Sequence, residues 1–191
     1  MKRFCLVRHG QTDWNREGRF QGQSDTPLNQ TGRAEAQSLA EQLKGYSFAA
    51  IFTSDLIRAK ETADIIATVL ALPVTMESRL REIKQGEWEG QFMEDIRTRN
   101  AKGWDERKID PVNFHPPGGE SVTEVAERTR AAMRNIVQLY PVGLVLIVSH
   151  GLALATIICR EEGIPIREAF QHIPENAVPT WVDWKDSPLS I

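Results

Sequence analysis

The amino-acid sequence predicts an α/β fold of three layers, in which a central, mostly parallel β-sheet is flanked by helices. Short apolar runs alternate along the 191 residues with segments of helical periodicity, and 41% of the residues are hydrophobic. The runs Phe4–Val7 and Leu144–Ser149 are nearly continuous in apolar residues, and His-Gly follows closely after each. That pattern is typical of strands buried on both faces of a parallel sheet, and the alternation of strands with helices predicts a layered architecture.

Five apolar runs are predicted to be β-strands because they are short and are bounded by turn or helix signals. In chain order they are Phe4–Val7, Ala50–Thr53, Val74–Met76, Leu144–Ser149 and Val178–Trp184. No internal repeat or low-complexity tract divides the chain, and its length is a little over that of one typical domain. We therefore expect a single domain over residues 1–191.

Two helices are predicted from apolar residues that recur every three or four positions in the first half of the chain. One covers residues 36–43 and has Thr31 as its expected N-cap. The other covers residues 59–70 and follows Ser54.

The strongest helical signal runs from Val122 to Tyr140. It opens with a capping box formed by Ser121 and Glu124, and Pro141 ends it. This segment is therefore predicted to be a long amphipathic helix.

The segment from Trp104 to Gly119 holds five prolines and glycines and shows no clear helical period. We predict a long loop there. Loops of this length in compact domains are usually functional, so we expect it to form a wall or lid over the site. Its aromatic residues Trp104 and Phe114 are candidates for substrate contact. Trp88, by contrast, is expected to pack in the core or in a wall.

Charge and composition exclude several classes of function. The 23 basic and 26 acidic residues give a net charge of −3, which offers no basic footprint for nucleic acid. No apolar run is long enough to cross a membrane and no signal-peptide pattern is visible, so we expect a cytoplasmic protein without a membrane partner. Cys5 and Cys159 lie in apolar runs and are expected to be buried thiols.

Two histidines occupy equivalent positions in the predicted sheet. His9 follows the first strand and His150 follows the fourth, and each precedes a glycine that permits a tight turn. Side chains just beyond the carboxyl ends of parallel strands face the crevice where ligands bind. We therefore expect both imidazoles at one edge of the sheet. The remaining histidines, His115 and His172, are expected in loop or surface positions.

The residues around these histidines favour phosphoryl transfer over other chemistries. The chain lacks HExxH, CxxC, GxSxG and the Walker and GxGxxG patterns, which disfavours metal, acyl-transfer and nucleotide sites. Arg8 adjoins His9, and Arg58 lies within the first turn after Ser54, at the same edge of the sheet if the strand Ala50–Thr53 is parallel to the first. Guanidinium groups match phosphate oxygens, and a helix N-terminus adds partial positive charge.

The sequence resembles the histidine phosphatase superfamily, in its phosphoglycerate-mutase-like branch. The resemblance lies in blocks that keep the family's order and span about four-fifths of the chain. The blocks are Leu6-Val7-Arg8-His9-Gly10-Gln11-Thr12-Asp13-Trp14-Asn15, Arg19-Phe20-Gln21-Gly22 with Asp25-Thr26-Pro27-Leu28 and Thr31-Gly32, Thr53-Ser54-Asp55-Leu56-Ile57-Arg58-Ala59 with Thr62-Ala63, Leu80-Arg81-Glu82 with Gly86-Glu87-Trp88-Glu89-Gly90, Gly118-Gly119-Glu120-Ser121, and Ser149-His150-Gly151.

The resemblance implies a catalytic phosphate site. His9 would be the nucleophile that takes the phosphoryl group, with its second ring nitrogen fixed by a backbone carbonyl near Gly10. Arg8, Arg58 and His150 would hold the non-bridging oxygens, with His150 serving as a cation once phosphate is bound. Asn15 would donate an amide hydrogen bond to the phosphate.

Glu82 would be the general acid that protonates the leaving oxygen, and its carboxylate would then accept a proton from the attacking water. Gln21 and Gly22 would line the substrate entrance. The resemblance implies no metal and no cofactor, because fixed cations take the place of magnesium.

Three functional hypotheses remain open. The short chain and the stretch Gly86–Gly90 resemble the phosphatase branch, such as alpha-ribazole phosphatase or broad-specificity small-molecule phosphatases, and a metal-independent phosphoserine phosphatase is also compatible. The first hypothesis is hydrolysis of a small phosphomonoester by a monomer or homodimer. The second is phosphoglycerate-mutase-type transfer, and the third is a catalytically silent binding module on the same fold.

Overall fold

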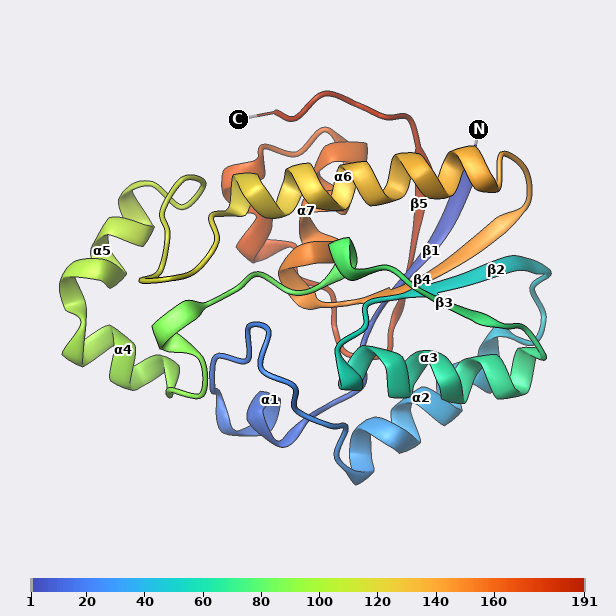
Figure 1. Cartoon of the computed structure of the whole chain (residues 1–191), viewed down its shortest axis with the longest axis horizontal. Helices are drawn as coiled ribbons and strands as arrows, with labels where there is room; N and C mark the ends of the chain where they lie inside the picture. Colours follow the sequence, from blue (N-terminus) through green and yellow to red (C-terminus); the bar gives the residue numbers. More distant parts are fainter. Residues whose placement is uncertain (1, 191) are drawn as a thin grey trace.

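The computed structural model describes residues 2–190, which form a five-stranded sheet with helices on both faces (Figure 1). The strand order is β3-β2-β4-β1-β5. Strands β1 to β4 pair in parallel, and β5 lies antiparallel against β1. The strands are β1 (Lys2–Arg8), β2 (Phe48–Thr53), β3 (Val74–Met76), β4 (Leu144–Ser149) and β5 (Pro179–Trp184). The predicted mostly parallel α/β sheet is confirmed.

Seven α-helices and three 3₁₀ helices lie within the described residues. The α-helices are α1 (Asp13–Glu17), α2 (Gln30–Leu43), α3 (Ile57–Leu70), α4 (Met93–Arg99), α5 (Ala101–Ile109), α6 (Val122–Leu139) and α7 (Gly151–Glu162). The 3₁₀ helices are η1 (Ser78–Leu80), η2 (Gly86–Trp88) and η3 (Ile166–Gln171). Helices α2 and α3 cover one face of the sheet, and α6 and α7 cover the other (Figure 1).

Successive residues of the central strands feed two separate cores, because side chains alternate across a strand. Phe4 and Leu6 pack with Met133 of α6 and other residues on that face. Cys5 and Val7 pack on the opposite face against α2 and α3. Burial on both faces explains the continuous apolar runs in the sequence. Cys5 is a buried, free thiol, as is Cys159, and both expectations are confirmed.

The structure corrects several boundaries. Strands β1 and β2 each begin two residues earlier than expected. Helix α2 begins at Gln30, and its N-cap is Asn29, whose side chain accepts a hydrogen bond from the Gly32 amide; Thr31 lies inside the helix. Helix α3 is capped by Leu56 without a side-chain hydrogen bond. Strand β5 begins at Pro179, one residue later than expected.

The predicted loop from Trp104 to Gly119 is wrong in its first third. Residues 101–109 form α5, whose first turn is capped by the side chain of Asn100. None of the residues of α5 is fully buried, so the helix leaves no apolar stripe in the sequence. Only the part after Ile109 is irregular.

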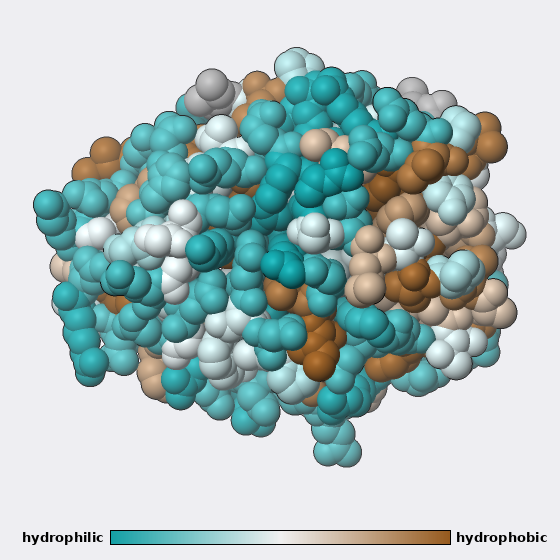
Figure 2. Space-filling model, viewed as in Figure 1, coloured by the Kyte–Doolittle hydropathy of each residue, from teal (hydrophilic) through white to brown (hydrophobic). Residues whose placement is uncertain are grey.

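The face of the molecule seen in Figure 2 is mostly hydrophilic. Its hydrophobic atoms gather at the right, where the matching view of Figure 1 places the ends of β2, β3 and α6. Exposed apolar side chains at the end of α6 and in the turn after it are Leu139 and Val142. Within residues 2–190, no helix is both long and apolar enough to cross a membrane.

Candidate active site

The parallel pairing of β1 with β4 brings the two motif histidines together. Arg8 lies opposite Ser149 in the register, and the His9 amide donates to the Ser149 carbonyl at 2.9 Å. The ring centroids of His9 and His150 are 5.2 Å apart. The sheet therefore places both imidazoles at one edge, as the sequence predicts.

The hydrogen bonds of His9 define its tautomer. Nδ1 lies 2.7 Å from the Gly10 carbonyl oxygen, which can only accept, so Nδ1 carries the proton. Nε2 accepts from Nε of Arg58 at 3.2 Å and is therefore unprotonated. Burial, followed by the charges of Arg58 and Arg8, places the pKa of His9 well below its ordinary value. His9 thus presents a neutral ring with a lone pair on Nε2.

Arg58 is fully buried in the first turn of α3, directly after β2. Its two terminal nitrogens donate to the carbonyls of Ser24 and Gly22, at 2.8 and 2.7 Å. Burial lowers the pKa of Arg58 to about 10, while the nearby Glu82 acts in the opposite direction. The guanidinium therefore stays charged at neutral pH in a fixed orientation.

Arg8 and His150 hold buried polar atoms that have no hydrogen-bond partner among residues 2–190. These atoms are Nε of Arg8 and both ring nitrogens of His150. Burial, then the charges of Arg58 and His9, lowers the pKa of His150 well below its ordinary value. Unsatisfied buried donors cost free energy, which an anion bound between them would recover.

Asn15 is oriented by the capping box at the start of α1. Its side-chain oxygen accepts from the backbone amide and hydroxyl of Thr12, at 3.1 and 3.0 Å. Because the oxygen is occupied, the amide NH₂ is the end that remains for a ligand. Asn15 lines the cavity beside His9, where this NH₂ can serve as a donor.

The carboxylate of Glu82 lies at the N-terminus of α7. It accepts from the amides of Leu152 and Ala153, each at 3.2 Å, and from its neighbour Ile83 at 3.0 Å. His150, the N-cap residue of α7, supplies no side-chain cap, so Glu82 takes that role from a distant part of the chain. Both oxygens of Glu82 are thereby fixed beside the histidine pair.

A further residue, Arg128 of α6, holds the backbone on which Glu82 sits. It donates to the carbonyls of Arg79, Arg81 and Glu82, at 2.8, 2.6 and 2.9 Å. Its guanidinium also pairs with Glu120 at 3.0 Å. This role could not be predicted from the sequence, because an arginine on a helix is normally a surface charge.

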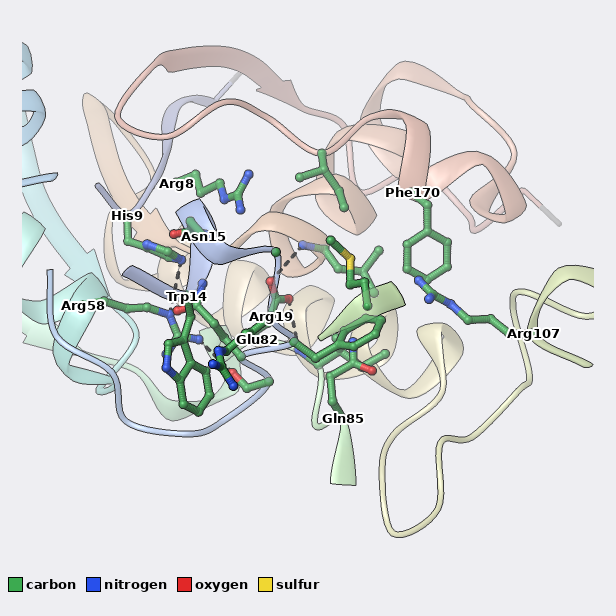
Figure 3. Close-up of a pocket in the computed structure, with 18 residues that line it drawn as sticks. Arg8, His9, Trp14, Asn15, Arg19, Arg58, Glu82, Gln85, Arg107 and Phe170 are labelled. Atoms are coloured by element: carbon green, nitrogen blue, oxygen red, sulfur yellow. Dashed lines mark hydrogen bonds between the residues drawn. The ribbon is translucent and has the colours of Figure 1, made fainter. Parts of the chain in front are cut away.

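Most of these residues line a cavity of about 340 Å³ (Figure 3), a volume suited to a small metabolite. His150 does not line it but lies fully buried against His9. The charged and polar lining of the cavity includes Arg8, His9, Asn15, Arg58 and Glu82. Apolar and aromatic side chains complete the wall. The sequence did not single out the residues Trp14, Arg19, Gln85, Met93, Arg107, Leu152, Phe170 and Ile173, which also line the cavity.

The four expected substrate-binding residues divide into two pairs. Gln21 and Gly22 line the cavity. Trp104 and Phe114 do not line it but pack against Trp88, with ring centroids 6.5 and 5.5 Å apart. Trp88 is itself buried, as expected. The aromatic pair therefore supports the wall from behind.

No group of three or more histidine, cysteine, aspartate or glutamate side chains within residues 2–190 is arranged to hold a metal ion. Glu82 is the acidic side chain that lines the cavity, and arginines surround it. His115 is exposed and pairs with Glu124, and His172 ends η3, so neither lies with the catalytic pair.

Comparison with known proteins defines the class. The profile of the histidine phosphatase superfamily (branch 1) matches residues 4–191. A probable phosphoglycerate mutase, GpmB, of Photorhabdus laumondii is 38% identical over 190 residues, which cover 98% of this chain and 87% of the relative. The chain belongs to the histidine phosphatase superfamily, branch 1.

Solved structures of this class share the fold closely. A mycobacterial glucosyl-3-phosphoglycerate phosphatase in complex with VO3 superposes with a TM-score of 0.88 at 31% identity, covering 97% of this chain and 94% of that one. The alpha-ribazole phosphatase of Shigella flexneri superposes with a TM-score of 0.87 at 27% identity, covering 97% and 92%. The family and these neighbours support phosphoryl hydrolysis or transfer as the chemistry of the site.

Proposed function

We propose that this protein hydrolyses a small phosphorylated metabolite through a phosphohistidine intermediate on His9. The observation that supports this most directly is the fixed tautomer of His9, with Nδ1–H on the Gly10 carbonyl and the Nε2 lone pair facing the cavity's cations. A nucleophilic imidazole must be unprotonated at the attacking nitrogen, and the lowered pKa of His9 meets that requirement.

In the first half-reaction, Nε2 of His9 attacks phosphorus and the bond between phosphorus and the ester oxygen breaks. The oxygen leaves with the bonding electron pair and takes the proton of Glu82, so an alcohol departs. The guanidinium of Arg58 shifts its donor from Nε2 to a phosphate oxygen as the new bond forms. Arg8, Arg58 and Asn15 offset the charge on the non-bridging oxygens.

In the second half-reaction, a water molecule attacks the phosphohistidine on the same phosphorus. Glu82, now a carboxylate, accepts the proton of the water, and the bond between phosphorus and Nε2 breaks. Inorganic phosphate leaves, and the neutral ring of His9 is restored. We propose that His150 takes up a proton when phosphate binds, since the anion reverses the electrostatic environment that lowers its pKa.

The proposal includes independence of metal ions, a small phosphomonoester as the partner, a monomeric or homodimeric state and a cytoplasmic location. Arg8 and Arg58 supply the positive charge that a metal ion would otherwise provide. A silent binding module is disfavoured, because His9, Arg58 and Glu82 line one cavity and His150 lies against His9.

Mutase activity is the second candidate, and the name of the Photorhabdus relative favours it. A mutase would pass the phosphoryl group from His9 to a second hydroxyl of the substrate before water reaches it. Phosphoglycerate isomers should be assayed with and without a bisphosphate primer. We expect phosphate release to exceed isomerisation; predominant isomerisation would establish the mutase.

The direct activity test uses p-nitrophenyl phosphate in the presence of excess chelator. We expect turnover that chelator leaves unchanged and that His9→Ala lowers by at least about 1,000-fold, since the nucleophile is lost. The exposed variant His115→Gln is the matched control and should retain wild-type turnover. Turnover that survives His9→Ala would contradict the proposal.

A further inference from the structure

Arg107 of α5 occupies an unusual environment in the cavity wall. Its guanidinium carbon lies 4.3 Å from the ring centroid of Phe170, 5.1 Å from that of Trp104 and 5.7 Å from that of Phe20. Stacking on aromatic rings uses the flat face of a guanidinium and leaves its N–H groups at the edge free to donate. Arg107 is thus held in place by apolar surfaces.

No acidic side chain within residues 2–190 pairs with Arg107. By contrast, Arg19 of the cavity lining pairs with Glu17 at 2.7 Å, and Lys108, the next residue along α5, pairs with Asp105 at 3.2 Å. Burial lowers the pKa of Arg107 to about 10, so the side chain still carries its charge at neutral pH. A half-buried cation without a counter-charge is costly, and an anion supplied by a ligand would offset that cost.

The position of Arg107 relates it to the substrate. Arg107 and Phe170 lie across the cavity from His9 and Arg58 (Figure 3), and all four line the same cavity. Apolar side chains such as Ile83 and Leu152 line the space as well. A ligand whose phosphoryl group faces His9 therefore extends past an apolar wall toward a second, separate positive charge.

We propose that Arg107 is a specificity-determining residue that binds a second anionic group, a carboxylate or a phosphate, on the non-reacting part of the substrate. The inference deepens the proposed function and rests on it, because it places the reacting phosphoryl group at His9. Substrates with a single anionic group bind without this contact. Arg107 contributes to affinity and substrate choice and takes no part in bond breaking.

Two matched pairs of probes test the proposal and separate the two anions. 3-Phosphoglycerate and glycerol 3-phosphate differ by a carboxylate in place of a hydroxymethyl group. Fructose 1,6-bisphosphate and fructose 6-phosphate differ by a second phosphate. We expect the wild type to prefer the member with the second anion in at least one pair, by about 10- to 100-fold in kcat/KM, the worth of a charge-assisted hydrogen bond.

The variant Arg107→Met keeps an apolar stem between the three rings and removes the charge. We expect it to abolish this preference, chiefly through KM, while glycerol 3-phosphate, fructose 6-phosphate and p-nitrophenyl phosphate change less than about twofold. Arg107→Lys should restore part of the preference. Lys102→Met is the matched control, since it removes a cation from an exposed position of the same helix and should leave the preference intact.

Two outcomes would overturn the inference. One is a wild type with equal kcat/KM for the two members of each pair. The other is an Arg107→Met variant whose kcat/KM falls equally on both members of a pair. The wild-type comparison stands even if the variant fails to fold. Binding of the same probes to His9→Ala by calorimetry separates this inference from the proposed function. Tighter binding of the second-anion probe, dependent on Arg107, supports the inference even where no hydrolysis occurs.

Discussion

At the scale of single residues, one backbone carbonyl decides which ring nitrogen of His9 is free for the nucleophilic role that we propose. The Gly10 oxygen takes the proton on Nδ1 of His9, so the lone pair must lie on Nε2. Nε of Arg58 donates a hydrogen bond to that lone pair, which disfavours protonation of the ring. The nucleophile is therefore prepared by two contacts, and both come from residues that the sequence motif contains.

The first prediction at this scale concerns Glu82. Replacing Glu82 with Gln removes the ionisable proton while keeping a side chain of similar size. Alkyl phosphates need a protonated leaving group, whereas p-nitrophenolate leaves readily without one. We expect kcat/KM, which reports the first half-reaction alone, to fall at least about 100-fold on glycerol 3-phosphate and much less on p-nitrophenyl phosphate. Equal losses on the two substrates would argue against acid catalysis by Glu82.

At the scale of elements, the carboxylate of Glu82, the proposed general acid, depends on helices distant in sequence. The amides at the start of α7 hold the oxygens of Glu82, and Arg128 of α6 holds its backbone carbonyl. Glu120 in turn fixes Arg128 and accepts from the amide of Lys84. The segment that carries Glu82 is irregular after η1, so these contacts take the place of a regular element.

Arg128→Met tests this arrangement. The carbonyls of Arg79 and Arg81 lose their donor, and that of Glu82 keeps only the one from Gln23. Glu120 loses its ion-pair partner, so we expect a loss of about 2–3 kcal/mol in the free energy of unfolding. Arg128 acts through Glu82, so its loss should slow alkyl phosphates more than p-nitrophenyl phosphate. Arg134→Met, on an exposed face of the same helix, is the control. A uniform loss on both substrates would indicate a structural role alone.

The elements differ in how well the sequence predicts them, and the reason is burial. The central strands and α6 bury continuous or periodic apolar sets, which a sequence displays directly. Helix α5 buries no residue fully and was read as loop. For the same reason the sequence identified the charged residues of the motifs but missed Arg107 and Arg128, whose importance depends on which distant groups surround them.

At the scale of the whole molecule, the fold buries one charged guanidinium and two imidazoles together, although the net charge of the chain is −3. Arg58, His9 and His150 are buried together, and both histidines stay neutral because burial and the neighbouring arginines disfavour the charged ring. Folding thus assembles an anion site at the cost of holding two imidazoles unprotonated.

This cost predicts a pH dependence of stability. A histidine in the unfolded chain has a pKa of about 6.5, whereas the pKa values of His9 and His150 in the folded chain lie well below it. The stability contributed by the neutral rings is complete above about pH 6.5. It is lost as the pH falls toward the lowered values, because only the unfolded chain takes up protons.

The free energy of unfolding should fall with decreasing pH by at most about 1.4 kcal/mol per pH unit for each histidine. Urea unfolding between about pH 5 and 8 measures this slope. The double variant His9→Gln/His150→Gln should show a shallower acid slope, while His115→Gln should retain the wild-type slope. An unchanged slope in the double variant would show that other groups govern the acid sensitivity.

Trapping the phosphorylated protein tests the central claim most directly. Glu82→Gln, which slows attack by water, should be mixed with p-nitrophenyl phosphate, quenched in alkali and examined by mass spectrometry and ³¹P NMR. The account predicts an acid-labile phosphoryl group on Nε2 of His9, because Nδ1 donates its hydrogen bond to the Gly10 carbonyl. A phosphoryl group on Nδ1 or on another residue, or turnover without any phosphorylated protein, would contradict it.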